Sequence, residues 1–222
     1  EGQSVKRPAG NLYSIYAMAL AVFMFALMDT VMKLLTARYP AIQVAALRSL
    51  TSLPLVAIYV GLRVGYRDIF KVRWPLHLLR GVLGIAMLTF FAFGIRNLSL
   101  AEAYTIFFVS PALITALSVW FLKERVGAAR WIAIVVGLGG VLVVLRPTGA
   151  GFLTIGGLAI LGAAAMYAVS AITVGILART DRNEHMVFWL MVMVAVGAGV
   201  LAAPGWVAMS MADLPLLGAL SL

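Results

Sequence analysis

Residues 59–74 read YVGLRVGYRDIFKVRW, and this stretch decides how the chain is arranged. It places four cations, Arg63, Arg67, Lys71 and Arg73, between two long apolar segments. Lys and Arg resist translocation across a bilayer, so a short connection that is rich in them stays in the cytoplasm. The stretch therefore predicts two membrane-spanning helices that meet at a cytoplasmic turn.

The remaining cations follow the same alternation along the chain. Every second connection is basic, and the predicted cytoplasmic side carries Lys6, Arg7, Arg63, Arg67, Lys71, Arg73, Lys123, Arg125, Arg130, Arg179 and Arg182. The connections of the opposite side hold only Arg38, Arg96 and Arg146. This asymmetry predicts a polytopic membrane protein whose amino terminus is cytoplasmic.

Composition agrees with this topology and excludes several classes of function. Hydrophobic residues make up 64% and charged residues 11% of the 222 positions, which is too little charge for a soluble globule of this size. A net charge of +9 would suggest nucleic acid in a soluble protein, but here the cations lie at helix ends, where lipid headgroups are the expected partners. We therefore expect a lipid bilayer and no nucleic acid. Cysteine is absent, and two distant histidines give no metal site, so no metal or cofactor is predicted.

Apolar length sets the predicted spans, because a helix needs about 20 residues to cross the hydrocarbon. After a cytoplasmic lead over residues 1–11, we expect spans near 12–36, 41–62, 74–95, 101–122, 129–146, 154–178 and 185–203. A further apolar stretch begins at Leu214 and is too short to span before Leu222, so we expect the chain to be incomplete at its carboxyl end.

A faint internal repeat joins the two ends of this array. The segment from Gly156 to Arg179 resembles the segment from Tyr16 to Arg38: each passes a polar position and closes on Ala-Arg. Five spans separate the two starts, and an odd number inverts the second copy relative to the first. Inverted repeats are typical of secondary transporters, whose substrate site lies near the midplane between the halves.

A set of short motifs points to a family. They are Leu100-Ala101-Glu102-Ala103, the mid-helix Pro111, the pair Glu124-Arg125, and Gly140-Val141 near the end of the fifth span. This pattern resembles the end of an EamA domain, the five-helix repeat of the drug/metabolite transporter superfamily. The family's earlier marks are matched by Lys33, Pro40 and Arg48.

This resemblance implies an all-α bundle of ten helices in two inverted five-helix repeats. The chain would then carry one complete repeat over 12–146 and part of a second over 154–222. Within the superfamily it most resembles bacterial exporters of amino acids, including the YddG-type exporters of aromatic amino acids. The resemblance thus implies a secondary transporter in the bacterial inner membrane that exports small organic metabolites, amino acids or amphiphilic drugs by alternating access.

The sequence also bears on two other classes of function. A channel or a structural membrane protein without coupled transport is the alternative that the sequence leaves open. An enzyme is not expected, because no nucleophile with its base and no cofactor loop gathers at one depth. The oligomeric state also stays open, with a monomer favoured.

Three charged residues form the sharpest candidate site. Asp29 and Lys33 share one helix face, and Arg48 lies at a similar depth on the next span, so all three could meet in the non-cytoplasmic half of the bilayer. One interpretation is a site for a zwitterionic solute, with Asp29 as a proton carrier. The other, which we favour, is an Asp29–Lys33 ion pair that fixes the first hairpin.

The remaining candidates are grouped by role. Expected cavity residues are His77, Phe90, Tyr104, Phe107, Ser110, Met166, Tyr167 and Ser170. Pro111 should kink the fourth span and act either as a hinge or as a static bend. We interpret Glu124, Arg125 and Gly140 as structural, with the glycines of that span allowing close helix approach. His77 and Arg80 either line the inner mouth or, as we favour, snorkel to the headgroups, and His185 is expected to be solvated.

Overall fold

The computed structural model describes residues 9–123, 125–145 and 153–220. Throughout this part of the chain the regular structure is helical. The α-helices are α1 (Ala9–Thr36), α2 (Ala41–Arg63), α3 (Trp74–Asn97), α4 (Leu100–Phe107), α5 (Ser110–Phe121), α6 (Ala128–Leu145), α7 (Ile155–Leu177), α8 (Asn183–Ala202) and α9 (Leu214–Leu220). Two short 3₁₀ turns, Ala203–Gly205 and Met211–Asp213, connect α8 to α9.

These helices confirm a polytopic all-α membrane protein. Six of the described segments are long and apolar enough to cross a bilayer, and α4 and α5 together make one of them, Leu100–Phe121. The predicted span at 129–146 corresponds to α6, a shorter apolar helix. A hydrocarbon environment favours helices because all their backbone bonds are satisfied within the segment.

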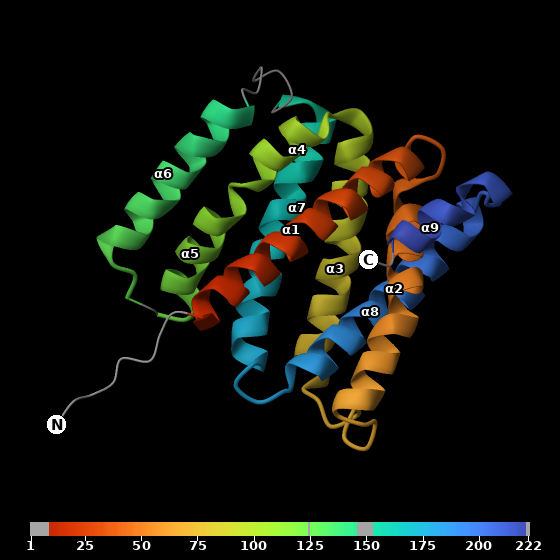
Figure 1. The fold of residues 1–222 in the computed structure, drawn as a ribbon, viewed down its shortest axis with the longest axis horizontal. Coiled ribbons are helices and arrows are strands. Elements are labelled where there is room, and N and C mark those ends of the chain that lie inside the picture. The colour runs from red at the N-terminus through yellow and green to blue at the C-terminus, as the bar shows by residue number, and fades with distance from the viewer. Residues whose placement is uncertain (1–8, 124, 146–152, 221–222) are drawn as a thin grey trace.

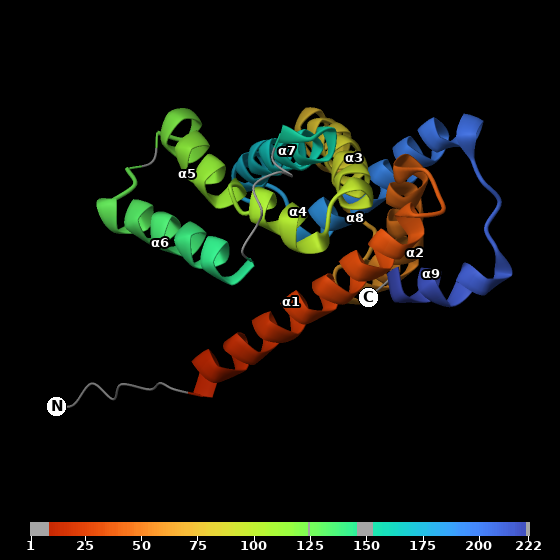
Figure 2. The ribbon, with the colours of Figure 1, turned by 90° about the horizontal axis from the view of Figure 1, so that it is seen from above.

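The centre of the bundle is built from α2, α3, α7 and α8. Helix α3 packs along both α7 and α8, and α2 packs along α8. Figure 1 shows α5 and α6 at one edge of this group and the α2–α8–α9 corner at the other. Helix α1 crosses one face obliquely, and Figure 2 shows its amino-terminal half diverging from the rest. The short α9 returns to pack against α1 and α2.

Small residues allow the central helices to approach closely. A Cβ atom at Gly94 of α3 would overlap Ile160 of α7 and lie 3.1 Å from the carbonyl oxygen of Gly156. On the other side of α3, a Cβ atom at Gly84 would lie 2.9 Å from Leu190 of α8. Lipid is as apolar as the helix surfaces, so association depends on this close packing rather than on hydrophobic burial.

The fourth span is broken where Pro111 predicts a kink, and this prediction is confirmed. Helix α4 ends at Phe107, whose successor Phe108 still donates its N–H to Tyr104 O at 2.9 Å, and α5 begins at Ser110. Proline has no N–H and its ring clashes with the preceding turn, so the helix restarts with Pro111 in the first turn of α5.

Replacing Gly94 by Ala should destabilise the α3–α7 contact by about 1–3 kcal/mol, because the added methyl group meets backbone as well as side chain. Thermal unfolding in detergent measures the loss as a lower Tm. Gly175→Ala in α7 is the matched control, since no atom lies within 4 Å of its Cβ position. Equal Tm values for the two variants would contradict the close-packing argument.

Candidate functional site

A cavity of about 600 Å³ lies between α1, α2 and α8. Its lining residues are Phe25, Met28, Arg48, Ser52, Leu55, Val56, Tyr59, Val60, Asn183, Glu184, Val187 and Met191. Most of them belong to the second half of α2 and the first half of α8, which are the halves on the predicted cytoplasmic side. The volume suits a small organic molecule.

Arg48 is the cation that this cavity holds at membrane depth. It lies two turns into α2, between the buried residues Leu47 and Ser49, and its side chain is partly buried. An isolated Arg at the centre of a membrane helix costs about 2.5 to 3.5 kcal/mol on insertion scales. Such a group is retained where it faces a polar partner or a water-filled space, and here it faces the cavity.

Asp29 of α1 is held by a tyrosine rather than by a cation. The Tyr104 hydroxyl donates to Asp29 Oδ2 at 2.8 Å, which ties α1 to α4. Arg48 attracts the same carboxylate electrostatically, but no hydrogen bond or ion pair joins the two side chains directly. Asp29 and Tyr104 therefore lie next to the cavity wall at Met28 without lining it.

The favoured Asp29–Lys33 ion pair is wrong. Lys33 Nζ donates instead to the carbonyl oxygens of Ile95, at 2.7 Å, and Leu98, at 2.6 Å. These carbonyls close the carboxyl end of α3, where orphan acceptors and the negative end of the helix dipole both favour a cation. Lys33 thus caps α3 and fastens α1 to it.

The aromatic candidates pack mainly on one another. Phe107 contacts Phe91 and Tyr167 with ring centroids 5.6 and 5.5 Å apart, which joins α3, α4 and α7. Phe90 lies against Gly162 of α7 and lines a shallow groove on another face. Of the predicted cavity residues, only Arg48 lines the cavity between α1, α2 and α8; Asp29, Lys33, His77, Phe90, Tyr104, Phe107, Ser110, Met166, Tyr167 and Ser170 do not.

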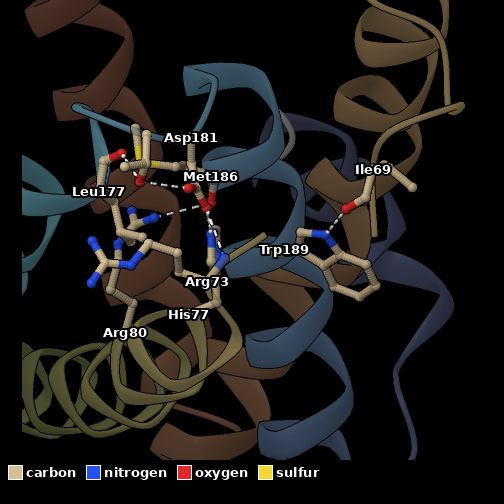
Figure 3. Close-up of polar contacts among 9 residues, drawn as sticks. Ile69, Arg73, His77, Arg80, Leu177, Asp181, Met186 and Trp189 are labelled. Carbon is tan, nitrogen blue, oxygen red and sulfur yellow. Dashed lines mark hydrogen bonds and ion pairs between the residues drawn. The ribbon is translucent and has the colours of Figure 1, made fainter. Parts of the chain in front are cut away.

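At the predicted cytoplasmic end, His77 is buried in a polar cluster, as Figure 3 shows. Its Nε2 donates to Asp181 Oδ2 at 2.8 Å, and that carboxylate also accepts from the Thr180 hydroxyl at 2.8 Å and the Arg73 N–H at 3.1 Å. Burial alone would raise the pKa of Asp181, but these three donors outweigh it and lower the pKa below 3.8. The stabilisation is therefore present at neutral pH and is lost as the pH falls through this lowered pKa.

The snorkelling interpretation of His77 and Arg80 is wrong, because both side chains point into the protein. Arg80 is 6% exposed and donates to Met186 O of α8 at 3.2 Å, while its Nε is buried with no partner. His185 is 4% exposed, so the expectation that it is solvated is also wrong. Trp189 Nε1 donates to Ile69 O at 2.6 Å and holds the α2–α3 connection against α8 (Figure 3).

A second polar cluster lies at the opposite end of the bundle, and no sequence pattern singled it out. Asp213 is buried, and its carboxylate accepts from Arg38 Nη1 at 2.6 Å and from the Tyr39 hydroxyl at 2.7 Å. Tyr39 Oη in turn accepts the Ser210 N–H at 3.1 Å. Nearby, Gln43 exchanges two hydrogen bonds with the backbone of Val207, at 2.8 and 2.9 Å.

The residues read as structural behave differently from the prediction. No described atom of another helix lies within 4 Å of a Cβ position at Gly140, so the close helix approach expected there is wrong and occurs on α3 instead. Arg125 is exposed, and Glu124 lies outside the described residues, so their pairing stays a prediction. Among the side chains that the structure describes, no three His, Asp or Glu residues gather as a metal site requires.

The sequence pattern of the EamA-like transporter family matches residues 12–146, which is more than half of the chain. The chain belongs to this family. The resemblance to the drug/metabolite transporter superfamily is thereby confirmed, and membership places the chain in a family of multi-pass transporters rather than of enzymes. The division into one complete and one partial repeat stays a prediction.

Curated relatives of this EamA chain carry small molecules of different kinds. It is 31% identical over 126 residues to the pseudopaline exporter of Pseudomonas aeruginosa, covering 56% of this chain and 44% of the relative. It is 26% identical to the riboflavin transporter of Vibrio cholerae, covering 85% and 64%. It is 31% identical to an S-adenosylmethionine uptake transporter of Rickettsia conorii, covering 54% and 40%. The chain thus spans about half the length of these relatives.

A solved crystal structure supports the fold. It superimposes with a TM-score of 0.64 at 21% identity, and the match covers 91% of this chain and 74% of the other. At this identity the likeness shows the fold alone.

The partners of Lys33 and Asp29 can be separated by double-mutant cycles on the free energy of unfolding in mixed micelles. Asp29→Asn and Tyr104→Phe should show coupling of about 0.5–3 kcal/mol, because they share a hydrogen bond. Asp29→Asn and Lys33→Met should be additive within about 0.5 kcal/mol. The single Lys33→Met variant should lose about 1.5–3 kcal/mol, as for hydrogen bonds to a charged group. Strong coupling between Asp29 and Lys33 would contradict this prediction and support an ion pair between the two residues.

Proposed function

We propose that this EamA chain forms the substrate cavity of a secondary carrier for small organic solutes that bear a negatively charged group. The carrier would work by alternating access in a bacterial inner membrane. The observation that supports the proposal is the cavity of about 600 Å³ with Arg48 among mostly apolar walls. A pocket with apolar walls and few polar groups suits an amphiphilic ligand.

The chemistry of the lining defines the solute. The Arg48 guanidinium can hold a carboxylate through two parallel hydrogen bonds. Phe25, Met28 and Leu55 offer apolar contact to the rest of the solute. Glu184 and Asn183, at the first turn of α8, can accept from an amino group. A zwitterionic amino acid with an apolar side chain would fit all three features.

Export is the proposed direction. Most of the lining residues of α2 and α8, though not Arg48 itself, come from the predicted cytoplasmic halves of these helices, where a solute that leaves the cell would bind first. The relatives include an exporter and uptake transporters, so their names are compatible with either direction.

Arg48→Gln should lower kcat/KM for anionic and zwitterionic solutes by about 10- to 100-fold, because a charged hydrogen bond is worth about 1.5–3 kcal/mol. Flux in proteoliposomes loaded with aromatic and aliphatic amino acids measures this. Arg67→Gln removes the same charge from an exposed position and should leave transport unchanged.

Counterflow separates a carrier from a channel in the same assay. A carrier shows saturation and is accelerated by solute on the opposite side, whereas a channel shows neither. Unchanged, saturable flux of every anionic solute in the Arg48→Gln variant would contradict the proposed site.

A further inference from the structure

The two buried polar clusters occupy equivalent places at opposite ends of the bundle. We name the first the inner clasp: Asp181 with its donors His77, Thr180 and the Arg73 N–H. We name the second the outer clasp: Asp213 with its donors Arg38 and Tyr39. In Figure 1 the α7–α8 and α2–α3 connections lie together at the lower end, and the α1–α2 turn lies at the upper end with the α8–α9 connection.

The equivalence extends to single positions. Asp181 directly precedes Arg182, the N-cap of α8, and it contacts Arg73, the N-cap of α3. Tyr39 directly precedes Pro40, the N-cap of α2, and it contacts Asp213, the residue before α9. In each case the turn between the first two spans of one predicted repeat binds the start of the third span of the other: the α7–α8 turn binds the start of α3, and the α1–α2 turn binds the start of α9. The operation that relates the two predicted inverted repeats would therefore place each of these two contacts at the position of the other.

Resting on the proposed carrier function, we propose that the inner and outer clasps are the two gates of the carrier, and that each must open for the cavity to reach its own side of the membrane. The gate residues are His77 and Asp181 inside, and Tyr39 and Asp213 outside.

Each clasp grips an element that lines the cavity. Two residues after Asp181 the chain enters the cavity wall at Asn183 and Glu184. On the other side, Tyr39 leads into α2, and Gln43 adds two further bonds to Val207 within a turn and a half of Arg48. Opening a clasp therefore frees the part of α8 or α2 that walls the solute site.

The burial of the two carboxylates makes the clasps act as switches with two states. The Asp181 and Asp213 side chains are 4% and 3% exposed. A buried carboxylate that loses its donors is costly unless water replaces them, so a half-open clasp is unfavourable. Each carboxylate is stable either when it is bound by its donors or when it is hydrated in an open vestibule.

Access to the cavity can be measured directly because the sequence contains no cysteine. Ser52 lines the cavity, and Ser52→Cys gives a single reporter for a membrane-impermeant maleimide. The reagent is applied from outside to intact cells and from the cytoplasmic face to inverted vesicles. The ratio of the two labelling rates reports which side the cavity faces, and it requires no knowledge of the substrate.

Opening the outer gate and opening the inner gate should shift this ratio in opposite directions. Tyr39→Phe and Asp213→Asn, in the outer clasp, should raise labelling from outside by several-fold relative to labelling from inside. Asp181→Asn, in the inner clasp, should shift the ratio by several-fold the other way. His77→Leu should follow Asp181→Asn, since it removes the donor of the same hydrogen bond.

Two matched controls keep the result specific. Asp68→Asn removes an exposed carboxylate that forms an ion pair with Lys71, three residues away, in the α2–α3 connection. Tyr66→Phe removes a hydroxyl that bonds within its own region to Ala57 O. Neither should change the ratio. Tyr39→Phe leaves the Arg38–Asp213 ion pair in place, so it tests the gate even if Asp213→Asn fails to fold.

The gate proposal is overturned if the folded clasp variants label like the parent, or if inner and outer variants shift the ratio in the same direction. Failure of the proposed function would look different, because no solute would then show saturable flux in the parent protein. Normal transport with an unchanged labelling ratio would reject the gates alone.

Discussion

A charged or polar group inside a bilayer must find its partner within the protein, and this requirement organises most of what the structure shows. Water cannot satisfy such a group in hydrocarbon, so several of these groups bond to a neighbouring helix. Lys33 takes the last carbonyls of α3, Asp29 takes the Tyr104 hydroxyl, and Arg80 takes a carbonyl of α8. Each bond joins two helices, so the polar groups act as the fasteners of an otherwise apolar bundle.

Arg48 is the exception, because its side chain has no such bonded partner among the described residues, and the proposed transport function depends on it. It is held at membrane depth beside a cavity, with Asp29 close enough to attract it but not to bind it. A cation with an incomplete set of partners keeps bonding capacity for a ligand. The same requirement that makes Lys33 a structural residue therefore makes Arg48 a candidate for binding an anionic solute.

The sequence predicts the helices well and their contacts poorly, for a physical reason. Apolar length, loop charge and Pro111 are local signals, and they place the spans and the break in the fourth one. The partner of Lys33 is a pair of backbone carbonyls more than 60 residues away. The residue types in a sequence do not indicate which backbone carbonyls lack a donor within their own helix. The spacing of the two residues on one helix instead predicts Asp29 as the partner of Lys33. The burial of His77 is not predictable from the sequence for a similar reason, since its partner Asp181 lies in a turn 104 residues further along the chain.

The cavity walls and the two clasps are also formed by residues that lie far apart in the sequence. Arg48 was found because a charge in an apolar span is conspicuous, whereas Phe25, Leu55 and Tyr59 look like any lipid-facing residue until α8 is placed beside them. Asp181 and Asp213 lie in connections, where a carboxylate is expected to be solvated, and yet their side chains are buried. Burial of a charge in a connection therefore carries more information than burial in a span. Within a span the fold must satisfy the charge in any case, but a connection could have left it in water, so a specific set of donors around such a carboxylate indicates that the contact itself has a role.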